Sequence, residues 1–140
     1  MGIEECKLVQ LPVVEDPQGN LAFAEEGGEI PFPIARVFYV YDVPAGAVRG
    51  GHAHISLEQV VFCVAGRFDV VVRDGTRRRK FAIEDPRLGL YLPPMVWHDL
   101  DGFSPGTVYL VLTSAPFDRN DYIRDYGEYL TATRAAEANV

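Results

Sequence analysis

The chemistry that this sequence can support centres on its histidines, of which there are 3 in 140 residues. His52 and His54 are two positions apart, so on a β-strand both side chains point to the same face. His98 follows two prolines and can bring a third imidazole from a later strand. Imidazole has a reference pKa of about 6.5, so it accepts or donates a proton near neutral pH. We therefore expect His52 and His54 to be catalytic, with His98 among the substrate-binding residues.

Other side chains near the histidines are candidates for binding a substrate. Arg49 precedes the pair across Gly50-Gly51, and its planar guanidinium can hold a phosphate or enediolate oxygen. Arg36 and Tyr39 lie in one β-rich run, but alternation puts them on opposite faces, and the sequence does not decide which face lines a cavity. Trp97 can stack on a base or sugar, or pack in a core. We expect Arg49, Arg36, Tyr39, Trp97 and Gln59 at the substrate site, Arg36 only if its face looks inward.

Short β-rich runs separated by turn residues must position these groups. The runs are, in chain order, 36–43, 59–64, 68–73, 77–83, 88–92 and 107–113. Asp74-Gly75 between two of them is a strong signal for a two-residue hairpin. Strands at this spacing predict an all-β sandwich or barrel. Residues 128–138 predict a short C-terminal helix, for which Asp118–Asp121 offers N-cap residues.

Composition and charge exclude several classes of protein. No linker or repeat divides the chain, so we expect a single domain over residues 1–140. A net charge of -7 excludes general nucleic-acid binding, although one or two arginines suffice for a small anion. No apolar stretch approaches the ~20 residues that cross a bilayer, so no membrane partner is expected. Cys6 and Cys63 form no CxxC pair, and the N-terminus lacks a secretory signal, which favours the cytoplasm.

Two segments carry a resemblance to a known superfamily: Gly46-x5-His52-x-His54-x4-Gln59-x6-Gly66 and Pro93-Pro-Met-Val-Trp-His98. They resemble the cupin motifs Gx5HxHx4Ex6G and PxGxxH, which implies a cupin-type double-stranded β-helix, the jelly-roll barrel. Metal-binding cupins hold their ion with the motif histidines and the glutamate. Here Gln59 stands at the glutamate position and Met95 at the glycine. Three imidazoles can bind Zn²⁺, but the missing carboxylate weakens that case, so we expect no metal ion.

Further segments, in one order along the chain, carry a closer resemblance: 31–39, 49–54, 57–60, 74–75, 89–91, 97–98 and 121–126. From about Val9 to Leu130 the chain is similar to the dTDP-sugar 3,4-ketoisomerases, the WxcM-like group of cupins. The resemblance implies that dTDP-4-keto-6-deoxyglucose is converted to a 3-keto sugar without a metal or other cofactor, in agreement with Gln59. It also implies a homodimer with exchanged N-terminal strands, and a product that serves amino-deoxysugar biosynthesis.

Two other functions remain as alternatives. A dTDP-sugar 3,5-epimerase uses similar proton abstraction, but members of that family have a longer chain and a single histidine with an aspartate partner. A non-catalytic cupin that binds a sugar or a metal is the other. Conversion of the 4-keto sugar by this protein, followed by NMR, distinguishes the three.

Overall fold

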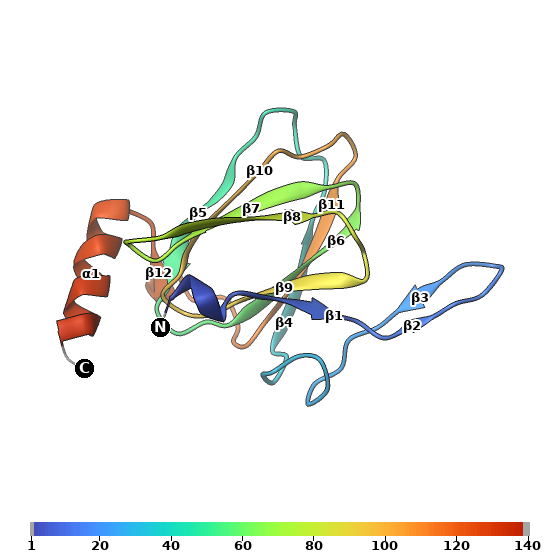
Figure 1. Cartoon of the computed structure of the whole chain (residues 1–140), viewed down its shortest axis with the longest axis horizontal. Coiled ribbons are helices and arrows are strands. Elements are labelled where there is room, and N and C mark those ends of the chain that lie inside the picture. The colour runs from blue at the N-terminus through green and yellow to red at the C-terminus, as the bar shows by residue number, and fades with distance from the viewer. Residues whose placement is uncertain (1, 139–140) are drawn as a thin grey trace.

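Two five-stranded antiparallel sheets form the walls of a barrel in the computed structural model, which describes residues 2–138 (Figure 1). Their strand orders are β1-β9-β6-β11-β4 and β12-β5-β10-β7-β8, and β2-β3 forms a separate hairpin. The strands are β1 (Lys7–Gln10), β2 (Val13–Val14), β3 (Leu21–Ala22), β4 (Arg36–Val40), β5 (Arg49–His54), β6 (Gln59–Ala65), β7 (Phe68–Arg73), β8 (Arg78–Ile83), β9 (Leu88–Leu92), β10 (Trp97–Asp101), β11 (Val108–Thr113) and β12 (Tyr122–Ile123). The helices are η1 (Ile3–Glu5), η2 (Arg119–Asp121) and α1 (Tyr126–Ala138). The expected all-β cupin-type jelly roll with a short C-terminal helix is confirmed.

Alternation along β6 and β11 gives the first sheet two apolar faces. Val61 and Val111 point into the barrel and belong to the main core cluster. Phe62 and Leu112 point outward and belong to a second cluster with Leu11 from the N-terminal segment. These runs are therefore continuous in hydrophobic residues, as strands covered on both faces are.

A bulge in β5 determines which residues of the strand that carries His52 and His54 face the barrel interior. His98 of β10 pairs with His52, but the next residue, Asp99, pairs with Gly50, so Gly51 is the extra residue. Gly50 and Gly51 have φ of 80° and 74°, a left-handed conformation that glycine adopts at little cost. A Cβ on Gly50 would lie 2.9 Å from the carbonyl oxygen of His98, so a larger residue cannot replace it without a shift.

The C-terminal helix lies beside the barrel, on the side away from the β2–β3 hairpin (Figure 1). It begins at Tyr126, and Asp125 caps it by accepting a hydrogen bond from the Glu128 N–H at 2.9 Å. The expected cap at Asp118–Asp121 is wrong for this helix, because Asp118 caps η2 instead. Tyr129 is fully buried, and its hydroxyl donates to the carbonyl oxygens of Arg73 and Met95, which fixes the helix to the second sheet. Among the described residues no helix is both long and apolar enough to span a bilayer.

Candidate active site

A cavity of about 500 Å³ opens between the two sheets of the barrel. Its walls come from β4, β5, β6, β10, β11 and the segment that contains β12. Of the expected site residues it is lined by His52, His54, His98, Gln59, Arg49 and Arg36. The structure therefore gathers six candidates from four strands into one hollow.

The histidines form a compact cluster on the β5–β10 wall. The ring centroid of His52 lies 5.0 Å from that of His54 and 4.7 Å from that of His98. Each of the three offers a ring nitrogen within 4.8 Å of the others. His98 Nε2 lies 3.3 Å from Nε2 of Gln59, and its Nδ1 lies 3.5 Å from the Val96 carbonyl oxygen. These contacts fit a neutral His98 that donates from Nδ1 and accepts from the Gln59 amide.

Burial keeps the three imidazoles neutral. Desolvation, with smaller contributions from the neighbouring His54 and Arg124, lowers the pKa of His52 to about 4. Desolvation also lowers the pKa of His54, against the Asp121 carboxylate, which raises it. The pKa of His98 is well below its usual value for the same reason, with His52 and His54 adding to the effect. At neutral pH His52 and His54 therefore each have a lone pair that can act as a base, whereas the lone pair of His98 accepts from Gln59.

The cavity is electropositive although the chain is acidic. Arg36, Arg49 and Arg124 line it, and none of the described lining residues is acidic. Arg36 lies over the rings of Phe38 and Phe117, and Arg124 lies 4.2 Å from the ring centroid of Tyr122. These contacts hold both guanidinium groups at the cavity wall. The site is therefore suited to an anionic ligand.

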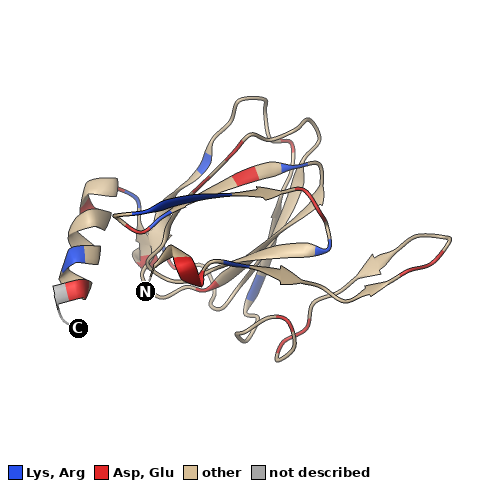
Figure 2. Ribbon diagram, viewed as in Figure 1, with Lys and Arg blue, Asp and Glu red and all other residues tan. Residues whose placement is uncertain are grey.

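A second basic feature lies outside the cavity. Figure 2 shows Lys and Arg gathered along β8, where Arg78, Arg79 and Lys80 are exposed. β8 is an edge strand, and charged side chains on an edge oppose pairing with other chains. None of these three residues lines the cavity, so the cations of β8 do not contribute to its positive charge.

Arg49 reaches the cavity because of the β5 bulge. Strict alternation would place Arg49 on the face opposite to His52, but the extra residue restores it to the same face, paired with Leu100. The Nε of Arg49 donates to the hydroxyl of Tyr109 at 2.9 Å. This hydrogen bond fixes the guanidinium plane and leaves its terminal N–H groups for a ligand.

Two expected site residues do not line the cavity. Tyr39 points away from it and is 62% exposed, because Arg36, Phe38 and Val40 take the inward face of β4. Trp97 lies on the outer face of β10, where it packs against Tyr126 and Tyr129. Neither residue therefore lines this cavity in the chain described here, and ligand contact by Tyr39 or Trp97 stays a prediction.

Three further residues belong to the site, although the two histidine motifs do not contain them. Tyr122 lies on β12, beside His54 of β5, and its ring centroid is 4.3 Å from that of His54. Tyr109 holds Arg49, as described above. Asp121 Oδ2 lies 3.4 Å from Nδ1 of His54. The segment 121–126, which contains both Asp121 and Tyr122, was part of the family resemblance, whereas Tyr109 carried no local signal of a site role.

The donor set at the cluster is three imidazoles and an amide. Nitrogen atoms this close together can converge on one Zn²⁺ ion after small rotations. The carboxylate that would complete a cupin metal set is absent, since Gln59 occupies its position and contacts His98. The residues therefore allow a metal ion but lack the anionic ligand that hard and borderline divalent ions favour.

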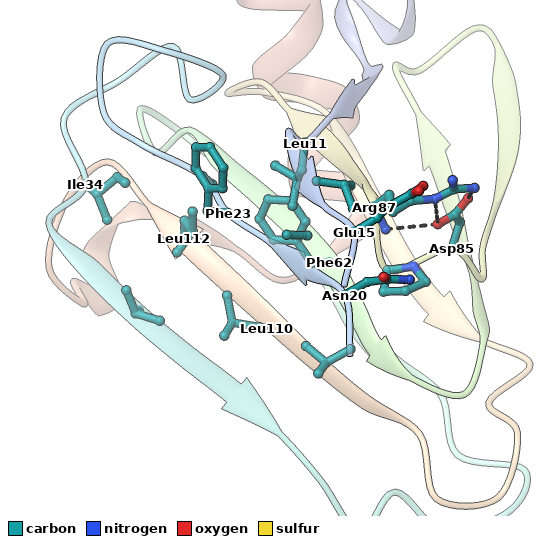
Figure 3. A pocket seen from close by; sticks show the side chains of 16 residues that line it. Leu11, Glu15, Asn20, Phe23, Ile34, Phe62, Asp85, Arg87, Leu110 and Leu112 are labelled. Carbon is teal, nitrogen blue, oxygen red and sulfur yellow. Dashed lines mark hydrogen bonds and ion pairs between the residues drawn. The ribbon is translucent and has the colours of Figure 1, made fainter. Parts of the chain in front are cut away.

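A larger hollow of about 740 Å³ lies on the outer face of the first sheet, under the N-terminal segment (Figure 3). Leu11, Phe23, Phe62, Leu110 and Leu112 line its floor and sides. Its polar groups lie at the rim, where Arg87 and Asp85 form an ion pair at 2.8 Å. It contains no histidine, and we name it the apolar groove.

Comparison with known proteins bears on the histidine cavity. Residues 4–134 match the family model described as FdtA: WxcM-like, C-terminal. The TDP-4-oxo-6-deoxy-alpha-D-glucose-3,4-oxoisomerase of Aneurinibacillus thermoaerophilus is 39% identical over 125 residues, which cover 89% of this chain and 90% of that protein.

Solved structures agree with this relationship. QdtA, a sugar 3,4-ketoisomerase from Thermoanaerobacterium thermosaccharolyticum in complex with TDP, has a TM-score of 0.91 and 34% identity, with 94% of this chain and 96% of that chain covered. The WlaRB TDP-quinovose 3,4-ketoisomerase from Campylobacter jejuni has a TM-score of 0.88 and 38% identity, with 92% and 99% covered. The chain therefore belongs to the FdtA/WxcM-like family of sugar 3,4-ketoisomerases.

Proposed function

We propose that this isomerase converts dTDP-4-keto-6-deoxyglucose to a dTDP-3-keto-6-deoxyhexose by proton transfer at His52 and His54, without a metal ion or other cofactor. The observation that carries the proposal is the cluster of neutral, buried imidazoles that shares a cavity with three arginines. The relative from Aneurinibacillus, which acts on this 4-oxo sugar by its name, supports the choice of substrate.

The reaction needs only proton transfers. The hydrogen on carbon 3 is acidic because the enolate formed on its removal is stabilised by the carbonyl at carbon 4. A base takes that proton, the electron pair forms a carbon 3–carbon 4 double bond, and the carbon 4 oxygen is protonated. The hydroxyl on carbon 3 then loses its proton, the double bond shifts to form the new ketone, and carbon 4 receives a proton. The product is an isomer of the substrate, so no oxidant or reductant is required.

His52 and His54 suit the two roles because they share one strand face and are both deprotonated at neutral pH. One imidazole transfers the protons to and from the carbon atoms, and the other transfers those of the enediol oxygens. Gln59 and His98 line the same cavity and are proposed to hold the sugar oxygens. Arg49 and Arg36 are proposed to bind the diphosphate, since charge-assisted hydrogen bonds from arginine are strong and directional.

One incubation tests the activity. The protein is mixed with dTDP-4-keto-6-deoxyglucose in D₂O, and the sugar protons are followed by NMR. We expect a 3-keto product with deuterium at carbon 4. Epimerisation at carbons 3 and 5 with the ketone still at carbon 4 would support the 3,5-epimerase alternative instead. An unchanged substrate that nevertheless binds would support a non-catalytic sugar-binding protein.

Metal independence is tested on the same sample. After exhaustive chelation we expect full turnover and, by elemental analysis, well under one metal ion per chain. The missing carboxylate at Gln59 is the reason for this expectation. Stoichiometric metal whose removal abolishes turnover, restored by adding it back, would contradict the proposal.

We propose further that the protein is a homodimer that exchanges its N-terminal strands and that it acts in the cytoplasm. The β2–β3 hairpin projects from the barrel (Figure 1) and exposes Val14 and Leu21, which are 54% and 56% accessible. The outer face of β4 next to the apolar groove exposes Val37 and Tyr39. A second copy would cover both apolar surfaces at once. Sedimentation of the wild-type protein at micromolar concentration should give the mass of two chains.

A further inference from the structure

Asp121 is the acidic group of the histidine site, and it lies behind the cavity wall rather than in it. It ends η2, directly before β12, and β12 pairs with β5 so that Tyr122 is opposite His54. The backbone carbonyl of Asp121 accepts a hydrogen bond from the Ile55 N–H at 2.9 Å. The pairing of β12 with β5 therefore fixes Asp121 beside the second catalytic histidine.

The carboxylate of Asp121 is held rigidly. Its Oδ1 accepts from the N–H of Ser56 at 2.9 Å and from the Ser56 hydroxyl at 2.7 Å. Its Oδ2 accepts from the N–H of Leu57 at 3.1 Å and lies 3.4 Å from Nδ1 of His54. Three hydrogen bonds thus fix the carboxylate without using the direction that faces the imidazole.

The His54 ring lacks any other partner for this nitrogen. His54 Nδ1 is buried and has no hydrogen bond of good geometry among the described residues. The rings of His52, His98 and Tyr122 pack against the His54 ring. A shift of a few tenths of an ångström would bring Nδ1–H into a normal hydrogen bond with Asp121, and such bonds are commonly long when no substrate is bound.

We propose that Asp121 is the positioning residue of the reaction, holding the Nδ1–H of His54 so that Nε2 presents its lone pair to the substrate. The carboxylate also stabilises the imidazolium that forms when His54 takes a proton, as an acidic partner does for a catalytic histidine in general. The inference rests on the proposed function for its kinetic part, whereas the tautomer of His54 is a property of the protein alone.

The tautomer is measured first, by ¹⁵N–¹H correlation of the imidazole rings in the wild-type protein at pH 8. We expect His54 to carry its proton on Nδ1, with assignment by comparison with His54→Asn. In Asp121→Asn we expect that preference to be lost. His54 protonated on Nε2 in the wild type, or an unchanged tautomer in the variant, would overturn the proposal whatever the enzyme's substrate.

The kinetic test compares Asp121→Asn with two controls. We expect kcat to fall on the order of 10²-fold with KM within about threefold, because substrate contacts remain while the base is misoriented. Asp118→Asn removes an exposed acid that caps η2 three residues earlier and should stay within twofold. Ser56→Ala keeps the charge but removes one anchor, and should lie between them.

These outcomes distinguish the two proposals. An Asp121→Asn enzyme that binds TDP and melts like the wild type, yet retains kcat within threefold, would overturn the role of Asp121. An equal loss in Asp118→Asn would show that disruption of η2 is the cause, and would also overturn it. A wild-type protein that does not convert the sugar at all contradicts the proposed function, while the tautomer measurement still tests Asp121.

Discussion

The two large hollows of this molecule are built on opposite faces of the same strands. β6 and β11 point Val61 and Val111 into the barrel, and Phe62 and Leu112 into the apolar groove. The groove is the larger hollow, about 740 Å³ against 500 Å³, yet the histidines line only the smaller one. Volume therefore does not locate the chemistry. The convergence of polar groups on the inward face does.

The two hollows also differ in what they contribute to stability. Apolar side chains in the groove gain about 25 cal/mol for each Å² removed from water when something covers them. The buried histidines instead destabilise the fold. Desolvation lowers their pKa values, and the Nδ1 atoms of two of them have no hydrogen-bond partner. Substitutions should therefore separate the two hollows, since those in the site affect turnover and those in the groove affect assembly.

The largest effect is expected for the catalytic pair. His52→Asn and His54→Asn should each lower kcat by 10² to 10⁴-fold, on the order usual for a general acid–base residue, because an amide cannot exchange protons at neutral pH. Melting temperatures should not fall, since each change removes a buried titratable ring. The measurement is steady-state turnover of dTDP-4-keto-6-deoxyglucose. Near-wild-type kcat in both variants would remove the two residues from the mechanism.

The matched change in the groove is Val37→Asp. Val37 is 54% exposed, lines the groove, and would be buried by a second copy in the proposed dimer. An unpaired carboxylate there should raise the dimer dissociation constant by at least ~10²-fold. Analytical ultracentrifugation over a dilution series measures it. Ala135→Asp, at an exposed position of α1 that does not line the groove, should leave the dimer intact. Equal weakening by both variants would count against the groove.

The features that the sequence predicted correctly depend on local periodicity. The shared inward face of His52 and His54 follows from their spacing. Asp74-Gly75 predicted the β7–β8 hairpin, although its loop is longer than the expected two residues, since Arg73 pairs with Arg78. The inward face of β4 could not be predicted, because Val37 on one face lines the groove while Arg36 and Phe38 on the other face line the cavity. Neither face is therefore directed simply to solvent. Alternation can identify two faces, but it cannot assign them when both are apolar.

The features that were missed depend on tertiary contacts. Asp121 reaches His54 only because β12 returns across more than 60 residues to pair with β5. Trp97 is adjacent to His98, yet the C-terminal helix buries it on the opposite face. The bulge at Gly50-Gly51, which brings Arg49 to the face of the histidines, depends on the pairing of β5 with β10. Single-sequence patterns carry no signal for such long-range packing.

The buried histidines also predict how the stability of the protein depends on pH, an effect of intermediate size. His52 has a pKa of about 4 in the folded protein and about 6.5 when unfolded. Between these two pKa values the unfolded chain binds more protons than the folded protein does. The free energy of unfolding is therefore highest above pH 6.5, with respect to His52, and falls as the pH drops. Between pH 7 and pH 5, the protonation of His52 alone should lower the free energy of unfolding by about 2 kcal/mol. Urea unfolding at both pH values should show a smaller loss in His52→Asn, and an equal loss would contradict the lowered pKa.

The smallest effect concerns recognition of the diphosphate. The chain has a net charge of -7, so cations at contact distance must dominate, since charges beyond about 8 Å are screened at physiological salt. Arg49 is held at the cavity by Tyr109, with its terminal N–H groups free for two parallel hydrogen bonds. Arg49→Lys keeps the charge but loses the planar fork, so KM should rise about three- to tenfold while kcat changes less.

Two further variants locate that effect. Tyr109→Phe removes only the hydroxyl that orients Arg49, and should raise KM by a smaller factor than Arg49→Lys. Arg78→Lys, on the exposed edge strand β8, should leave KM unchanged because β8 lies outside the cavity. The three KM values are measured against dTDP-sugar at 0.15 M salt. A change below about twofold in Arg49→Lys would move the phosphate site to another cation of the cavity, with Arg124 the next to test because its guanidinium is already held against Tyr122.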